Sequence, residues 1–353
     1  MKNLEKTKVF NVNIERIDEL VTPKQIREEI PSDDSIVNHV YESREAVRRI
    51  IHGEDQRLIG IIGPCSIHDQ ELAYHYAEKI AKLRNEVKEK IEIVMRVYFE
   101  KPRTSTGWKG LINDPHLNGS FHVEEGLRTA RRILKTINMM GVPCATEMLD
   151  PLVPQYIADF VTWTAIGART TESQTHREMA SGLSMPVGFK NATNGDVTVA
   201  INAIKSSISP HSFLGVHQDD GRLSVFHTNG NPDCHVVLRG GNGGPNYSEN
   251  HIKGYEAELE KAKIKTKMII DCNHANSGKD PYKQPAVLEE IVRQKNNGNK
   301  SIVGFMIEGN IYGGSQSIPE DLTQIKYGIS VTDECLDWEM TEKSVREMFN
   351  KLK

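Results

Sequence analysis

The feature that most constrains the fold of this chain is a repeated alternation of short apolar runs with amphipathic helical segments. Runs such as Leu58–Gly63 lack the polar–apolar alternation of a half-exposed strand, and they are typical of parallel strands buried on both faces. The runs lie near residues 58–63, 91–98, 142–147, 163–168, 186–190, 235–239, 267–271 and 302–307. Eight such strand–helix units predict an α/β fold of the closed (β/α)8 TIM barrel type. A doubly wound open sheet is the alternative.

Two segments stand outside this alternation. Residues 1–55 precede the first strand, and we expect them to form an N-terminal extension with two helices, the first capped by Thr22-Pro23 and the second ended by Gly53. Residues 56–353 would form the catalytic barrel. Within it, residues 213–228 hold two apolar runs around Asp219-Asp220-Gly221, a pattern that predicts an inserted β-hairpin.

Composition and charge narrow the class of protein. The formal net charge of −4 gives no electrostatic basis for binding nucleic acid or an anionic membrane. No apolar run approaches the roughly 20 residues that span a bilayer, and the N-terminal stretch lacks an apolar signal core. The five cysteines are an odd number and widely spaced, which favours a reducing cytoplasm over a disulfide framework.

Cationic side chains fall at the ends of successive predicted strands, where barrel enzymes carry their catalytic groups. Close together in a partly dry pocket, these charges would repel one another strongly, and phosphate-bearing ligands would relieve that repulsion. Considered singly, each arginine is better explained as a member of a structural ion pair, so the prediction rests on the group. We also expect a helix to begin at Ala168-Arg169 and to add its backbone amides to the phosphate site. The cations are Arg96, Lys101, Arg169, Lys190 and Arg239.

A second set of strand-end residues has the chemistry of metal ligands. Cys65, His274, Glu308 and Asp333 would together suit a divalent transition metal with one position left open. Alone, Cys65 is a small buried apolar residue and His274 a hydrogen-bonded core histidine. The four are scattered along the chain, so their spacing does not decide between these interpretations.

Several longer motifs resemble class I 3-deoxy-D-arabino-heptulosonate 7-phosphate (DAHP) synthase. They are GPCSIHD at 63–69, RVYFEKPRT at 96–104, GWKGLINDPH at 107–116, GARTTESQ at 167–174, GFKN at 188–191, LRGG at 238–241 and HANS at 274–277. The resemblance implies a TIM barrel with an N-terminal extension and an inserted hairpin. It also implies an enzyme that condenses phosphoenolpyruvate with erythrose 4-phosphate, the first step of the shikimate pathway of aromatic amino acid biosynthesis.

The resemblance assigns roles to residues of the matching motifs. Cys65, His274, Glu308 and Asp333 would hold one divalent metal ion (Mn²⁺, Fe²⁺, Co²⁺ or Zn²⁺). Lys101, Lys190 and His274 would be catalytic. Phosphoenolpyruvate would contact Arg96, Lys101, Glu147, Ala168, Arg169, Lys190 and Arg239, whereas erythrose 4-phosphate would contact Lys101, Pro102, Arg103 and Thr104.

Some residues depart from the family pattern. Asn242-Gly243-Gly244 follows LRGG where a lysine is common, and Asn273 precedes the strand-end histidine where a serine is usual. These changes leave open a related synthase with a different sugar-phosphate acceptor. A metal-dependent phosphohydrolase and a non-catalytic phosphate-binding protein are the alternatives from other classes.

The regulatory region departs further from the family pattern. Family members are often inhibited by an aromatic amino acid, bound in a cavity near the hairpin that a neighbouring subunit's arm completes, and they self-associate to dimers or tetramers. Asn11-Val12-Asn13 replaces acidic residues of the arm, and Gly215 replaces a small hydroxyl residue. We therefore expect altered or absent feedback. Gln155, Leu183, Ser184 and Phe213 would line the cavity.

Overall fold

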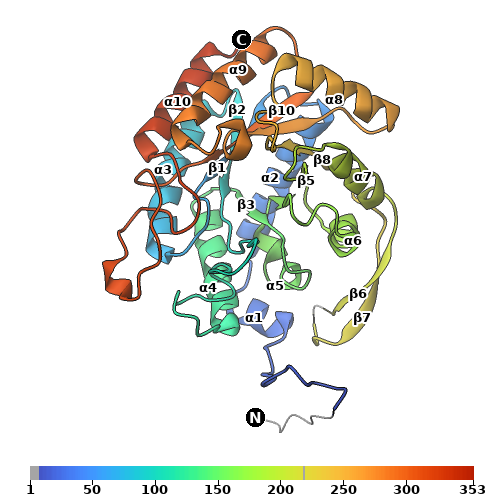
Figure 1. Cartoon of the computed structure of the whole chain (residues 1–353), viewed down its shortest axis with the longest axis vertical. Helices are drawn as coiled ribbons and strands as arrows, with labels where there is room; N and C mark the ends of the chain where they lie inside the picture. Colours follow the sequence, from blue (N-terminus) through green and yellow to red (C-terminus); the bar gives the residue numbers. More distant parts are fainter. Residues whose placement is uncertain (1–7, 218) are drawn as a thin grey trace.

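The computed structural model describes residues 8–217 and 219–353, and in it eight parallel strands close into a barrel surrounded by helices (Figure 1). The strand order is β1-β10-β9-β8-β5-β4-β3-β2, so the TIM barrel is confirmed and the open sheet is excluded. The barrel strands are β1 (Leu58–Gly63), β2 (Ile91–Arg96), β3 (Cys144–Glu147), β4 (Trp163–Ile166), β5 (Val187–Lys190), β8 (Cys234–Leu238), β9 (Met268–Asp271) and β10 (Ile302–Glu308).

The barrel strands are buried along their whole length, as their apolar runs predict. One side of each strand packs into the barrel interior and the other packs under the outer helices. Those helices are α3 (Gln70–Val87), α4 (Val123–Met139), α5 (Pro154–Ile157), α6 (Gln174–Gly182), α7 (Thr198–Ser207), α8 (Glu249–Lys261), α9 (Gln284–Asn296) and α10 (Trp338–Lys351). Short 3-10 helices cover Ala158–Phe160, His274–Asn276, Pro281–Lys283 and Leu322–Gln324.

Two helices precede the barrel, α1 (Pro23–Glu29) and α2 (Asp34–His52). Thr22 caps α1 in a reciprocal capping box with Gln25, and Gly53 ends α2 in a left-handed conformation with φ of 79°. The end of α2 buries Val47, Ile50 and Ile51 in one apolar cluster with barrel-interior residues. Each such side chain contributes roughly 1.5–3 kcal/mol by leaving water, so α2 is part of the barrel's core.

The inserted hairpin is present as predicted. Strands β6 (Ser212–Val216) and β7 (Leu223–His227) pair antiparallel outside the barrel and extend beside α6 and α7 (Figure 1). Gly215 in β6 lets the Phe226 ring lie close to the backbone, because a Cβ atom there would lie 2.3 Å from that ring and would displace it. The ring of Phe226 stacks on that of Phe213 with their centroids 5.7 Å apart.

The apolar stripe of Val345, Met348, Phe349 and Leu352 predicts a last helix that starts at Thr341. Helix α10 begins earlier, at Trp338, because the Asp337 side chain accepts a hydrogen bond from the Met340 amide and caps the helix. Among the described helices, none is long and apolar enough to cross a membrane. All five cysteines are buried and unpaired.

Candidate active site

The carboxyl ends of the barrel strands surround a cavity of about 790 Å³. All of the residues predicted to bind substrate line it, together with His274 and Asp333. The parallel pairing produces this convergence, since Gly63 of β1 lies opposite Glu308 of β10 and Asp271 of β9 lies opposite Met306. The residues that line the cavity from the predicted set are Arg96, Lys101, Pro102, Arg103, Thr104, Glu147, Ala168, Arg169, Lys190 and Arg239.

Arg96 ends β2 and is almost completely buried at the floor of the cavity. Its Nη2 atom lies 2.7 Å from Glu308 Oε1, its Nε donates to the Pro64 carbonyl at 3.0 Å, and its guanidinium lies 3.6 Å from the centre of the Tyr98 ring. Burial alone would lower the pKa of Arg96, but the Glu308 carboxylate raises it above its ordinary value. Arg96 is therefore a permanent positive charge within the site.

Cys65, Glu308 and Asp333 come together beside Arg96, with candidate ligand atoms all within 4.8 Å of one another. The Cys65 thiol donates to Asp333 Oδ2 at 3.5 Å, and His274 Nε2 lies 4.0 Å from Glu308 Oε1. The segment after β10 brings Asp333 to this place, because Thr332 hydrogen-bonds Ser66 through their hydroxyl groups at 2.7 Å.

This group fits a divalent metal ion. Glu308 Oε1 is buried and accepts no hydrogen bond of ordinary geometry from the described residues, although Arg96 lies beside it. The thiol and the two carboxylates, with the His274 imidazole near Glu308 but outside this close group, match the ligand preferences of Zn²⁺ and of similar transition metals. Burial, with a contribution from Glu308, raises the pKa of Cys65 to about 11, so the metal-free thiol is neutral at pH 7.

Lys101 lies directly beside this group. Its ammonium is buried, with Nζ 3.0 Å from Cys65 Sγ and 3.9 Å from Asp333 Oδ2. Burial alone would lower the pKa of Lys101, but Cys65 and Glu308 raise it above its ordinary value. The neighbouring residues Arg103 and Thr104 are exposed at the cavity rim, so this loop spans the site from floor to solvent.

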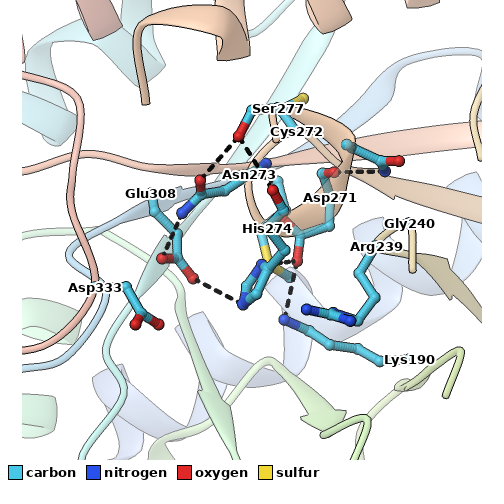
Figure 2. Close-up of polar contacts among 12 residues, drawn as sticks. Lys190, Arg239, Gly240, Asp271, Cys272, Asn273, His274, Ser277, Glu308 and Asp333 are labelled. Atoms are coloured by element: carbon cyan, nitrogen blue, oxygen red, sulfur yellow. Dashed lines mark hydrogen bonds and ion pairs between the residues drawn. The ribbon is translucent and has the colours of Figure 1, made fainter. Parts of the chain in front are cut away.

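Asp271 is a residue to which the sequence analysis gave no role, and it connects two predicted ones (Figure 2). Its buried Oδ2 atom accepts a hydrogen bond from Lys190 Nζ at 3.0 Å and lies 2.9 Å from His274 Nδ1. Burial alone would raise the pKa of Asp271, but His274 and Lys190 hold it well below the ordinary value. Among the described residues His274 Nδ1 makes no hydrogen bond of ordinary geometry, so the 2.9 Å contact with Asp271 is a charge contact, and Nε2 lies on the Glu308 side.

The departure at Asn273 also has a structural consequence. Its side-chain amide donates to Glu308 Oε2 at 2.8 Å and accepts a hydrogen bond from the Ser277 hydroxyl at 3.2 Å (Figure 2). One oxygen of Glu308 is thus held by Asn273, and the other faces Arg96 and His274. Asn273 therefore orients a candidate metal ligand.

Three guanidinium groups line the cavity without a protein partner. In the described part of the chain, the side chains of Arg103, Arg169 and Arg239 make no ion pair and no hydrogen bond, although Arg239 is half-buried. Burial lowers the pKa of Arg239, and nearby Arg169 lowers it further. Such unpaired cations favour a polyanionic ligand.

Two further predictions concern the rim of the cavity. The helix expected at Ala168-Arg169 is absent, because α6 begins at Gln174 and the amides of Thr170 and Thr171 instead bond to Gly167 in a turn. The prediction that a helix dipole at Ala168 helps to bind phosphate was therefore wrong.

Glu147 lies beside Gly167 at the same rim. Its buried Oε1 atom has no hydrogen-bond partner in the described residues, and Gly167 leaves room for this atom, since a Cβ there would lie 2.2 Å from it.

A second cavity, of about 610 Å³, lies between the hairpin and the barrel. It is lined by the four residues predicted to line the effector cavity, which are Gln155, Leu183, Ser184 and Phe213, and also by Gly215, among others. Apolar rings on one wall and the polar groups of Gln155 and Ser184 elsewhere suit a small amphiphilic molecule.

Known proteins match this chain along nearly all of its length. The model of the DAHP synthetase I family matches residues 26–346. The Tyr-sensitive phospho-2-dehydro-3-deoxyheptonate aldolase of Escherichia coli is 50% identical over 99% of this chain and 98% of its own length. The Phe-sensitive enzyme of the same organism is 48% identical over 97% of each chain.

A solved structure is equally similar. Phospho-2-dehydro-3-deoxyheptonate aldolase from Francisella tularensis superposes with a TM-score of 0.93 at 47% identity, covering 96% of this chain and 98% of that one. The family match over most of the chain and the near-complete coverage of these relatives lead to one conclusion. The chain belongs to the DAHP synthetase I family.

Proposed function

We propose that the barrel mouth carries out its family's reaction with one divalent metal ion held by Cys65, His274, Glu308 and Asp333. The reaction is the condensation of phosphoenolpyruvate with erythrose 4-phosphate to DAHP and phosphate, the first step of aromatic amino acid biosynthesis. The observation that supports the proposal most is that arginines without a partner among the described residues line the same cavity as His274 and Asp333. Cys65 and Glu308 lie directly beside Asp333.

The cations on one side of the cavity would bind phosphoenolpyruvate. Arg169 and Arg239 suit its phosphate, and Arg96, Lys101 and Lys190 lie deeper, where its carboxylate would sit. Glu147 and Ala168 complete this end of the cavity. Fixed charges of this kind hold the anion in one orientation and need no rearrangement as the reaction proceeds.

Erythrose 4-phosphate would enter along the loop from Lys101 to Thr104. Arg103 and the Thr104 hydroxyl lie at the rim, suited to its phosphate, and Lys101 lies at the floor beside Cys65, where the aldehyde would reach. A bound divalent ion supplies Lewis-acid polarisation of that aldehyde. His274, oriented by Asp271, would fix the ligand geometry on which this polarisation depends.

The bond changes follow from this placement. The enol carbon of phosphoenolpyruvate bonds to the aldehyde carbon, and the aldehyde oxygen takes a proton. Water adds to C2 of the former enol and loses one proton, which leaves a hydroxyl group on C2. The bond between C2 and the phosphate oxygen then breaks, the hydroxyl proton passes to the departing phosphate, and C2 becomes a ketone. Lys190 would orient that water or transfer the proton, because its Nζ is buried, charged and held by Asp271.

Regulation and assembly are proposed on separate grounds. The relatives named Tyr-, Phe- and Trp-sensitive support an aromatic amino acid as the effector, and the second cavity has the size and lining for one.

Exposed apolar side chains of the N-terminal arm (Phe10, Val12, Ile17) and of the hairpin (Leu214, Leu223) support self-association to a dimer or tetramer. The buried, unpaired cysteines support a cytoplasmic location.

The acceptor sugar is tested by a substrate panel. Loss of phosphoenolpyruvate absorbance would be followed with erythrose 4-phosphate, ribose 5-phosphate, arabinose 5-phosphate or no aldehyde. We expect consumption only with erythrose 4-phosphate. A preference for another sugar phosphate would show that Asn242 and Asn273 mark a changed acceptor, and phosphate release without any aldehyde would identify a phosphohydrolase.

A further inference from the structure

Three side chains that ligate transition metals meet on the surface at the start of α4, outside the barrel mouth. They are His116, His122 and Glu125, and their candidate ligand atoms all lie within 4.8 Å of one another. His116 Nε2 is 2.9 Å from Glu125 Oε2, and His122 Nδ1 is 3.6 Å from the same oxygen. The two imidazole rings are 5.4 Å apart, edge to face.

The turn before α4 creates this arrangement. Asp114 accepts hydrogen bonds from the amide of Gly119 through its carboxylate and from the amide of Leu117 through its carbonyl, which folds the chain back on itself. Leu117 and Phe121 both have positive φ, at 56° and 53°, where residues other than glycine are uncommon. The backbone therefore takes an unfavourable path that places His116 over the first turn of α4.

All three side chains are available to a ligand. They are exposed to solvent. His122 is the N-cap residue of α4, yet its side chain makes no capping hydrogen bond. In the described residues the charged partners of Glu125 are the two histidines, whereas Glu124 beside it is already paired with Arg128.

We propose that His116, His122 and Glu125 form a second metal site, which takes a borderline divalent ion such as Zn²⁺. Two imidazoles and one carboxylate are the ligands of many three-residue zinc sites, with water in the remaining position. Bonds of about 2.0–2.1 Å in a tetrahedron separate ligand atoms by roughly 3.4 Å. The observed 2.9 Å and 3.6 Å separations are close to that value, so an ion fits after small side-chain rotations.

The experiment counts metal ions on the full-length protein. Metal-stripped wild type and the His116→Ala/His122→Ala variant would be dialysed against Zn²⁺ at pH 7.5, and bound zinc measured by elemental analysis. We expect the wild type to hold one more ion per chain than the variant, whatever the barrel site holds. Equal numbers of bound zinc ions per chain in the wild type and in this variant would overturn the proposal.

Two further variants make the test specific. Glu125→Gln keeps the shape of the side chain and should weaken zinc binding at this site by about tenfold or more, since a direct ligand is lost. His217→Ala removes an exposed imidazole that lies 3.5 Å from a single carboxylate, that of Asp220. The His217→Ala variant should hold as many zinc ions per chain as the wild type. If it lost as much zinc as the His116→Ala/His122→Ala variant, the extra ion would be binding exposed histidines without selectivity, and the proposed site would be rejected.

Discussion

Replacing Asp271 with asparagine tests the electrostatic design of the active site. Asp271 is fully buried and balances the buried Lys190 ammonium at 3.0 Å while lying 2.9 Å from His274 Nδ1. The substitution keeps the shape but leaves Lys190 without its counter-charge. Breaking a buried ion pair from one side costs about 3–5 kcal/mol, so we expect a loss of unfolding free energy of that order.

The same change should weaken metal binding. Without the carboxylate, the His274 ring loses the anionic group 2.9 Å from its Nδ1 atom, and losses of such partners lower metal affinity by about 10- to 100-fold. Urea unfolding gives the stability, and competition with a chromophoric chelator for Mn²⁺ or Zn²⁺ gives the affinity. His116→Ala/His122→Ala would be the background, so that only the barrel site is measured.

Asp159→Asn is the matched control. Asp159 pairs with Arg131, a fully buried arginine on α4, with 2.6 Å between Arg131 Nη1 and Asp159 Oδ1. This variant should lose stability but keep its metal affinity. An Asp271→Asn protein whose metal affinity stays within twofold of the parent would refute the orienting role of Asp271, even if it were less stable.

Three further predictions address single interactions. Asn273→Leu, which removes the 2.8 Å hydrogen bond to Glu308, should lower the metal affinity of the barrel site by about tenfold in the same chelator competition, whereas Asn273→Gln should retain more of it. Arg239→Ala should weaken phosphoenolpyruvate binding in calorimetry by about 1.5–3 kcal/mol, or about 10- to 150-fold. The melting temperature should change little, because the Arg239 side chain has no partner among the described residues. Burial lowers the pKa of His235 to about 4, and the neutral ring accepts a hydrogen bond from Trp163. The same histidine in the unfolded chain binds a proton below about pH 6.5, so the free energy of unfolding should fall by roughly 3 kcal/mol as the pH drops from 6.5 to 4. Urea unfolding of wild type and His235→Gln measures this, and a stability difference between the two proteins that does not change with pH would contradict it.

The sequence predicted the barrel because local pattern and global fold agree. Runs such as β1 and β10 are apolar at every position that needs burial, and the caps at Thr22 and Gly53 mark helix ends through local hydrogen bonds. The start of α10, which we placed too late, is set by its capping residue Asp337. A capping residue just before an apolar stripe is a signal that the sequence did contain. The turn at Ala168 could not be foreseen, since its amides bond to Gly167 rather than continue into α6.

The candidate site was predictable in its residue types but not in its contacts. Strand-end positions and the family resemblance predicted Cys65, His274, Glu308 and Asp333 as metal ligands. The meeting of Cys65 with Asp333, however, depends on a hydrogen bond between the hydroxyl groups of Ser66 and Thr332, which are far apart in the chain. A role for Asp271 could have been found in the sequence, because it is an acidic residue that ends a buried strand three positions before a histidine. No sequence pattern revealed that the unusual Asn273 would hold one oxygen of Glu308.

The most direct test of the account is a paired assay on metal-stripped protein. Phosphoenolpyruvate and erythrose 4-phosphate would be supplied together and separately, before and after addition of Mn²⁺, while loss of the enol absorbance and formation of DAHP are measured in the same sample. We predict turnover only with both substrates and the metal, and no restoration by the metal in Cys65→Ala. Full DAHP formation by the stripped enzyme, or by Cys65→Ala at the wild-type rate, would contradict the proposed metal-dependent site.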